Sequence, residues 1–341
     1  MNKDLYLRVF NNKFLNCFIF DIIYQYHRAI PYQKVYRWND LKECPLAITA
    51  NGYIELLKQY YQRHPIKDEQ SYDISDVIVR AIIMGRLDIV MLIIEGQGLE
   101  SKQRILETSH SHQIDYLHFA VVNNRFEILL YLDSLPNIFR NYQFNLSMSP
   151  HSNNLEMVRY FSDRVNGTKK TPNLFDNAAA SGNLEIIKWL ATNRTQDRVG
   201  VSMYFQAVFH NRMNVLEFLR KEKRDAHCTK GVNLLDTAAK RGNFNILMWL
   251  HRYRIGKCSK NAMDYAAGNN DLGIVKWLHE NRTEGCSSKA MELAAENNHL
   301  DVVKWLFENR TEGNIQRVID IATFYNHNDM VEWLTENSTF Q

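Results

Sequence analysis

The sequence predicts an all-α protein, a solenoid of about ten stacked helix-turn-helix repeats that follows a helical N-terminal cap. Three observations predict this fold: a block of sequence that recurs, a helical apolar period inside each block, and Gly or Asn at one fixed place. The clearest copies are residues 262–282, AMDYAAGNNDLGIVKWLHENR, and residues 290–310, AMELAAENNHLDVVKWLFENR, which are offset by 28 residues.

The last apolar residue of the block serves as an anchor for following the repeat along the chain. Residues three and four before each anchor are also apolar, so the three positions share one face of an amphipathic helix. Spacings between anchors range from 28 to 39 residues and are most regular toward the C-terminus. The anchors are Tyr60, Ile93, Leu132, Phe161, Leu190, Leu219, Leu250, Leu278, Leu306 and Leu334.

A Gly or Asn stands eight residues before every anchor. These two residue types best tolerate left-handed backbone geometry, and just past a helix end they indicate a C-cap. A first helix is therefore expected to end there, and a second helix to begin at once. The positions are Gly52, Gly85, Asn124, Asn153, Gly182, Asn211, Gly242, Asn270, Asn298 and Asn326.

The starts of the first helices are marked by residues that favour N-caps. Thr171, followed by Pro172, and the two serines Ser259 and Ser287 lie nineteen residues before their anchors. Ala-Ala pairs near the ends of these helices would let neighbouring helices approach closely. One repeat carries Ser149–Pro150 in place of the Ala pair, which predicts a broken first helix.

Composition narrows the class of function. The 341 residues include 41 Lys and Arg against 38 Asp and Glu, and this near balance gives no support for nucleic acid or an anionic membrane as the main partner. No apolar run is long enough to cross a bilayer, and the N-terminus lacks a convincing signal peptide. We therefore expect an intracellular, cytoplasmic monomer. Phosphate-loop, GxSxG and HExxH motifs are absent, so we expect no enzyme, no cofactor and no metal.

The core pattern Ala-Ala-x-x-Gly/Asn-x-Leu-x-Ile-Val-x-x-Leu resembles the ankyrin repeat over roughly residues 41–341. The repeat is about 28 residues long, shorter than the usual ankyrin repeat of about 33 residues, and the Thr-Pro-Leu-His segment of the usual repeat is missing. The short repeat with Lys-Trp-Leu-x-Glu-Asn-Arg is similar to the ankyrin-like repeats of large social-amoeba families. The resemblance implies a binding scaffold without catalysis, which would bind another protein on its concave helical surface.

Residues 1–40 precede the repeats and leave two interpretations open. Their apolar residues between Phe18 and Ile23, with Tyr36 to Trp38, are weakly similar to an F-box, although the leading Leu-Pro is absent. As a cap, the segment would cover the first repeat. As an F-box-like element, it would make the chain a substrate-recruiting adaptor of a ubiquitin ligase.

Two rows of equivalent positions are the candidate binding residues. The acidic row, fourteen before the anchor, would either brace connecting loops through backbone N–H groups or form a stripe that selects basic partners. Its members are Asp176, Phe205, Asp236, Asp264, Glu292 and Asp320. The variable row, four residues later, has no common chemistry and is the best candidate for a partner-specific surface. Its members are Ala180, Phe209, Lys240, Gly268, Glu296 and Phe324. The predicted partner-binding set is Asp176, Phe209, Asp236, Lys240, Asp264, Glu292, Glu296, Asp320 and Phe324.

A solenoid makes a prediction about dimensions in solution. Small-angle X-ray scattering should give a radius of gyration well above the roughly 20 Å of a compact globule of this length. Circular dichroism should show helix with little strand. A compact radius would contradict the solenoid.

Overall fold

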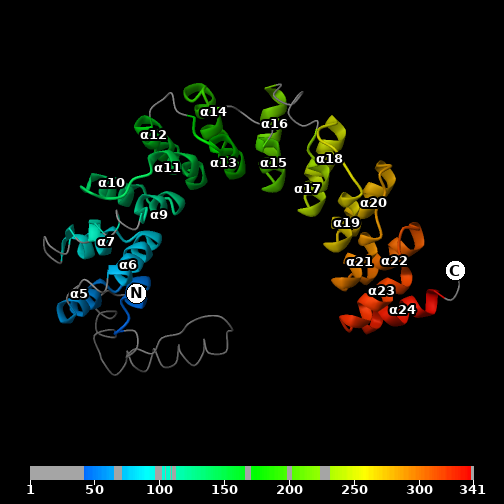
Figure 1. Cartoon of the computed structure of the whole chain (residues 1–341). Coiled ribbons are helices and arrows are strands. Elements are labelled where there is room, and N and C mark those ends of the chain that lie inside the picture. Colours follow the sequence, from blue (N-terminus) through cyan, green and yellow to red (C-terminus); the bar gives the residue numbers. More distant parts are fainter. Residues whose placement is uncertain are drawn as a thin grey trace, which may run out of the picture. The chain divides into compact units, whose positions relative to one another are not determined.

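Helices make up all the regular secondary structure in the part of the chain that the computed structural model describes (Figure 1). Those residues are 42–64, 71–96, 113–165, 170–197, 202–222 and 231–338, with 102, 103, 105–107 and 109. The all-α prediction is confirmed for them. They fall into two units, one ending at Val165 and the other starting at Asn166. The expected cap at 1–40 lies outside the described residues.

The N-terminal unit is a series of helix pairs, each formed by a first helix and a second helix. The first helices contact one another in order, α4 with α6, α6 with α9 and α9 with α11. The pairs are α4 (Pro45–Ala50) with α5 (Ile54–Arg63), α6 (Ser71–Met84) with α7 (Leu87–Glu95), α9 (Tyr116–Val122) with α10 (Phe126–Ser134), and α11 (Tyr142–Met148) with α12 (Leu155–Arg164).

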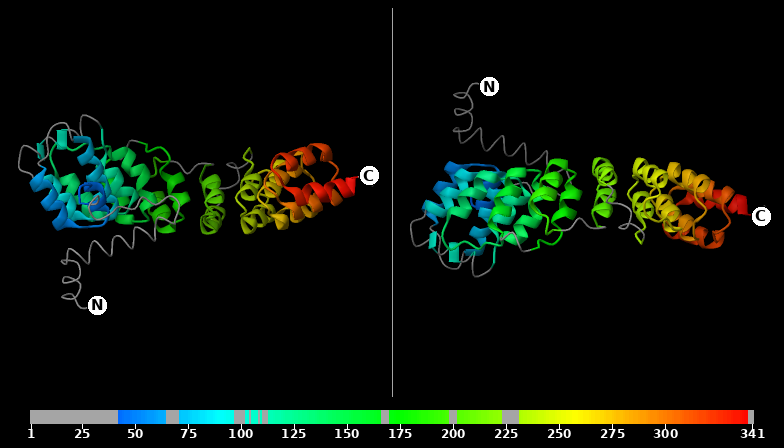
Figure 2. Two further views of the ribbon diagram at one scale, coloured as in Figure 1. Left: turned by 90° about the horizontal axis from the view of Figure 1, so that it is seen from below. Right: turned by 90° about the horizontal axis from the view of Figure 1, so that it is seen from above.

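The C-terminal unit continues the same arrangement, and Figure 2 shows it from two further sides. Each first helix, from α13 to α21, packs on the first helix of the next pair. The pairs are α13 (Leu174–Ser181) with α14 (Leu184–Asn193), α15 (Ser202–Phe209) with α16 (Met213–Lys221), α17 (Leu234–Lys240) with α18 (Phe244–Tyr253), α19 (Asn261–Gly268) with α20 (Leu272–Asn281), α21 (Lys289–Glu296) with α22 (Leu300–Asn309), and α23 (Ile315–Phe324) with α24 (Asn328–Ser338).

Every anchor lies in the second helix of a pair. From Ile93 to Leu334 the anchors are buried, and Tyr60 is half-buried. The Ala pairs of the first helices are buried as well, for example Ala266 and Ala267 in α19. Since a single pair has no other surface against which to bury these faces, the core of each unit runs continuously from pair to pair.

The turn inside each pair has the predicted left-handed residue. All ten Gly and Asn positions have positive φ, from +53° at Asn124 to +82° at Gly182. The hydrogen bonds around most of these turns form a Schellman motif, in which two backbone N–H groups cap the helix carbonyls. In one example, the amide of Asn298 donates to the carbonyl of Ala295 (3.2 Å) and that of His299 to Ala294 (2.8 Å).

Side chains from one turn also cap the first helix of the preceding repeat. The Arg212 guanidinium donates from Nε to the carbonyl of Ala180 (2.8 Å), and the Asn243 amide donates to Val208 (2.8 Å). These carbonyls lie in the last turn of their helices, where no intrahelical partner is present. These bonds therefore join neighbouring repeats, and they also give a hydrogen-bond donor to carbonyl groups that have none within their own helix.

Two predicted features of the first helices have different outcomes. The break at Ser149–Pro150 is confirmed, because α11 ends at Met148 and a short 3₁₀ helix, Ser149–Ser152, follows it. The N-cap at Thr171 is wrong. Helix α13 begins only at Leu174, so Pro172 is not its first residue, and the Thr171 amide instead donates to the Asp197 carboxylate (2.6 Å).

The predicted N-caps at Ser259 and Ser287 are wrong by one residue, because Lys260 and Ser288 are the N-caps of α19 and α21, but both serines still bind a helix amide. Helix α19 begins at Asn261, two residues after Ser259, yet the Ser259 hydroxyl oxygen accepts from the Asn261 amide (3.2 Å). Ser287 accepts in the same way from Lys289 (3.2 Å) at the start of α21. Each serine binds the start of its helix through a short turn.

Substituting Gly182 by Ala should reduce the free energy of unfolding by about 1–2 kcal/mol, because an L side chain is disfavoured at this φ of +82°. A Cβ there would also lie 2.7 Å from the Cδ of Arg212. Gly273, inside α20, meets nothing within 4 Å, so Gly273→Ala should raise stability by about 0.5–1 kcal/mol. Urea unfolding followed by circular dichroism measures both variants, and shifts of the same sign would contradict the interpretation of the turn.

Candidate functional site

The acidic row follows successive first helices of the C-terminal unit, from Asp176 in α13 to Asp320 in α23. Its two central members, Asp236 and Asp264, are almost fully buried, with exposed fractions of 5% and 2%. A buried carboxylate needs hydrogen-bond donors to offset its loss of hydration. The surrounding residues therefore decide what this row does.

The donors for these carboxylates come from the serine that starts the next repeat. The Ser287 amide donates to Oδ1 of Asp264 (2.8 Å), and its hydroxyl donates to Oδ2 (2.6 Å). Ser259 binds Asp236 in the same way: its amide donates to Oδ1 (2.7 Å) and its hydroxyl donates to Oδ2. Because each serine also binds the first amide of the following helix, Asp236 and Asp264 set the start of the next repeat. This geometry supports loop bracing over the basic-partner stripe at these two positions.

The remaining members of the row diverge from this pattern. Asp176 is half-buried, and this burial raises its pKa although a hydrogen bond with Ser202 opposes the shift. Glu292 forms an ion pair with Arg317 at 3.0 Å. Asp320 is exposed, and its Oδ1 accepts from Gln316 of the same helix (3.0 Å). The structure therefore contains no uniform stripe of free carboxylates along this row.

The variable row lies closer to solvent. Phe324 is the most exposed of its members, with 78% of its surface accessible, while Lys240 and Glu296 are exposed and Phe209 is half-buried. Glu296 accepts a hydrogen bond from the Tyr325 hydroxyl (3.2 Å). The accessible members thus combine aromatic, basic and acidic side chains, as expected of a partner-specific surface, whereas Ala180 is buried and Gly268 has no side chain.

An open groove of about 300 Å³ lies where the two rows cross helices α15, α17 and α19. It is lined by Phe209, Asp236 and Lys240 from the predicted set, and by Arg241 and Tyr265, which the sequence analysis did not single out. The sequence could have pointed to Arg241, because this residue directly follows the variable-row residue Lys240. The structure thus brings one aromatic, one acidic and one basic member of the set together.

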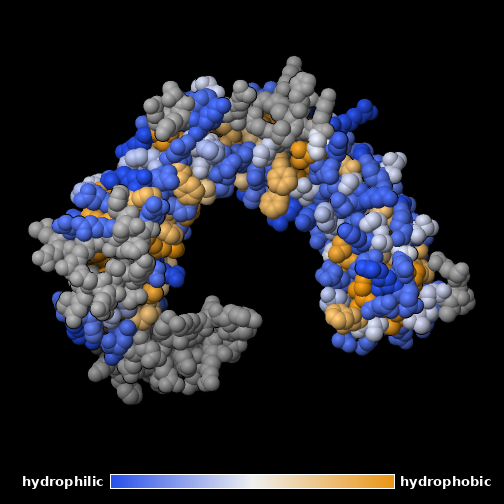
Figure 3. All heavy atoms as spheres, viewed as in Figure 1, coloured by the Kyte–Doolittle hydropathy of each residue, from blue (hydrophilic) through white to orange (hydrophobic). Residues whose placement is uncertain are grey.

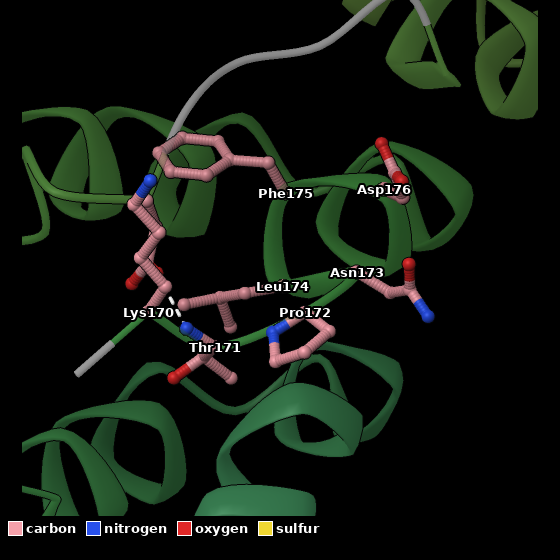
Figure 4. Close-up of a pocket in the computed structure, with 8 residues that line it drawn as sticks. Lys170, Thr171, Pro172, Asn173, Leu174, Phe175 and Asp176 are labelled. Atoms are coloured by element: carbon pink, nitrogen blue, oxygen red, sulfur yellow. Dashed lines mark hydrogen bonds between the residues drawn. The ribbon is translucent and has the colours of Figure 1, made fainter.

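A second concavity, of about 320 Å³, lies at the start of α13 (Figure 4). Figure 4 shows Thr171 to Asn173 on the segment that leads into the helix, with Asp176 on the helix itself. Beside it, the guanidinium of Arg194, which is only 2% exposed, donates to Asp197 (2.8 Å) and to Thr171 (3.1 Å). This buried network joins the ends of one repeat and has a structural role.

The sequence signal for that network is an arginine four residues after the anchor. Arg282 and Arg310 occupy the same position and pair with Glu284 and Glu312. This arginine ends the Lys-Trp-Leu-x-Glu-Asn-Arg motif of the repeat, but its spacing alone does not indicate the acidic partner that it binds.

The described residues contain no cluster of three metal-ligating side chains. His110 and His112, a closely spaced pair of histidines in the sequence, lie outside the described residues. Cys258 and Cys286 are free thiols. Burial, with a smaller effect of nearby carboxylates, raises the pKa of Cys258 to about 12 and that of Cys286 to about 11. Both thiols are therefore protonated, and so weak nucleophiles, at neutral pH. No helix in the described ranges is long and apolar enough to span a membrane.

Comparison with known families identifies part of the chain. A family model for ankyrin repeats (3 copies) matches residues 235–317 and, in a second alignment, residues 265–340. No curated protein matches the chain. The matched segment contains helices α18 to α24, the serine braces of Asp236 and Asp264, and the last four of the six members of the variable row.

Loss of a brace should cost stability. Asp264→Ala leaves the Ser287 amide without its partner, so unfolding should require about 1–3 kcal/mol less. Asp320→Ala removes a carboxylate of the same row whose one hydrogen bond is exposed, and should change stability by less than about 0.5 kcal/mol. Urea unfolding of both variants tests the difference. Equal effects would show that the row does not brace the repeats.

Proposed function

Residues 235–340 carry ankyrin repeats, and we propose that this chain is a non-enzymatic scaffold that binds another protein through the variable row of its first helices. Ankyrin repeats generally mediate protein–protein interaction. Stacked repeats present an extended surface in which each repeat contributes a few side chains. The observation that carries the proposal is that the row changes chemistry from repeat to repeat while its neighbours Asp236 and Asp264 serve the fold.

The proposed binding residues fall into two groups. Phe209, Lys240, Glu296 and Phe324 would contact the partner directly, with the more accessible acidic residues Asp176, Glu292 and Asp320 at the side. Asp236 and Asp264 would contribute by holding the helix starts in register. We propose a monomer in the cytoplasm as the working form, and a protein rather than a nucleic acid as its ligand. The free thiols of Cys258 and Cys286 are compatible with a reducing compartment.

The adaptor alternative stays a prediction, because the F-box-like segment lies within residues 1–40, outside the described residues. Co-purification of ubiquitin-ligase core subunits that is lost on deletion of residues 1–40 would favour it.

Comparative affinity purification tests the scaffold. The tagged wild-type chain, a Phe209→Ala/Lys240→Ala/Phe324→Ala variant and a control variant are used to capture proteins, which are then quantified by mass spectrometry. The control, Lys188→Ala/Lys276→Ala, alters exposed residues on second helices. We expect specific proteins to be lost with the first variant and retained with the control. A set of captured proteins that is identical for all three chains would contradict binding through the variable row.

A further inference from the structure

The groove across α15, α17 and α19 has a chemistry of its own, which indicates the kind of partner segment that fits it. It lies on the surface that we propose to bind a protein, so the inference rests on that proposed function. Figure 3 shows apolar atoms gathered in the region of α15, with hydrophilic atoms beside them. The volume of about 300 Å³ is at the small end of the range for ligand pockets. It suits one large side chain rather than a whole helix.

The apolar part of the groove is aromatic. The rings of Phe205 and Phe209 stack at a centroid distance of 5.8 Å, with an interplanar angle of 24°. Tyr265 lies on the other side of the groove, on α19, and all three side chains are half-buried. Aromatic surface that remains partly open on a rigid helix is typical of sites that receive an apolar anchor residue.

The free charge at the groove is positive. Lys240 and Arg241 are both exposed, and neither has a carboxylate at ion-pair distance in the part of the chain that the structure describes. Their cationic groups lie over aromatic rings, Lys240 Nζ at 4.9 Å from the centroid of Tyr265 and Arg241 Cζ at 4.4 Å from that of Phe209. Asp236 also lines the groove, but both of its carboxylate oxygens are bound by Ser259.

The rims of the groove carry polar groups that can bind a peptide backbone. Asn233 and Asn261 are exposed, and their side-chain amides have no hydrogen-bond partner among the described residues. An amide side chain both donates and accepts, as a peptide group does. Asn233 directly precedes α17, and Asn261 is the first residue of α19.

We propose that this groove binds an acidic peptide segment of the partner protein, which inserts an aromatic or large aliphatic side chain between Phe209 and Tyr265. Flanking Asp or Glu residues of the segment pair with Lys240 and Arg241. Arg241 Nε already donates to the Phe209 carbonyl (3.2 Å), so the two terminal amino groups of the guanidinium remain to hold a carboxylate through parallel hydrogen bonds, which adds geometric selectivity. This charge preference is the opposite of the one that the acidic row suggests from sequence.

A single-stranded nucleic acid is the other polymer that combines negative charge with flat rings, and the groove suits it less well. Binding of such strands uses free aromatic faces for successive bases and a track of cations along the backbone. Here the partly open rings of Phe205, Phe209 and Tyr265 line a single groove of about 300 Å³, which has room for one large side chain and not for a row of successive bases. The groove also has two cations rather than a track.

Fluorescence anisotropy with the full chain tests the proposal. The probe is a short labelled peptide with one Trp flanked by Asp and Glu. Its controls are the same peptide with Trp replaced by Ala, the same peptide with Lys and Arg in place of the acids, and a single-stranded oligonucleotide. The acidic Trp peptide should bind most tightly, and added salt should weaken it. No binding up to about 1 mM, or tighter binding of the basic peptide or of the oligonucleotide, would overturn the proposal.

Charge reversal separates recognition from folding. Lys240→Glu/Arg241→Glu should weaken the acidic Trp peptide by about tenfold and should strengthen the basic one. A gain of binding to the basic peptide cannot come from an unfolded chain. Lys188→Glu/Lys276→Glu makes the same charge change on exposed residues of second helices and should leave both affinities as they are. Equal responses of the two variants would overturn the proposal.

Failure of this inference is distinguishable from failure of the scaffold function. If only the inference is wrong, proteins captured by the wild-type chain are still lost with the Phe209→Ala/Lys240→Ala/Phe324→Ala variant. Their capture would then not be inhibited by the acidic Trp peptide. If the scaffold function is wrong, no protein distinguishes the variable-row variant from its control.

Discussion

The left-handed residue that ends each first helix is the constraint on which the rest of the structure depends. With positive φ at that residue, the chain reverses within a single turn, so a second helix can pack directly on the first. The same turn exposes helix carbonyls at its outer side, where side chains of the next repeat bind them, as Arg212 binds Ala180. One backbone conformation therefore fixes both the shape of a pair and its attachment to the next pair.

The choice between Gly and Asn at this turn follows from the side chain that the next repeat places over it. At three of the four Gly turns an arginine crosses the turn, and no Cβ obstructs it; the fourth, Gly242, faces the Asp271 carboxylate, which a Cβ would approach to 3.1 Å. A Cβ at Gly85, for example, would lie 2.9 Å from the Cζ of Arg125. Asn occurs where a smaller group crosses, as at Asn124, whose Oδ1 accepts from the Asn154 amide (3.2 Å). The Gly pairs are Gly52 with Arg86, Gly85 with Arg125, and Gly182 with Arg212.

Features that depend on residue type at a fixed spacing could be predicted from sequence, and features that depend on contacts between repeats could not. Anchors and turns repeat in every pair, so their burial and handedness follow from local physics. The Asp264 brace depends on a serine 23 residues later, and neither residue alone indicates a bond. Thr171 matches the spacing of an N-cap, yet its hydroxyl oxygen accepts from the buried Arg194 guanidinium (3.1 Å), and helix α13 begins three residues later. The local rule fails where a residue of another helix offers a stronger partner.

The candidate site shows the same limit in its electrostatics. Formal charge along the acidic row suggests an acidic surface, but a carboxylate that is bound by backbone and hydroxyl donors and almost fully buried offers little to a partner. Asp236 and Asp264 are in that position, whereas Lys240 has a long side chain that reaches solvent. The charge available for binding therefore depends on which charged side chains are already bonded to groups of a neighbouring repeat. At the groove across α15, α17 and α19, Ser259 binds both carboxylate oxygens of Asp236, while no described carboxylate pairs with Lys240 or Arg241, so the charge available to a partner there is positive.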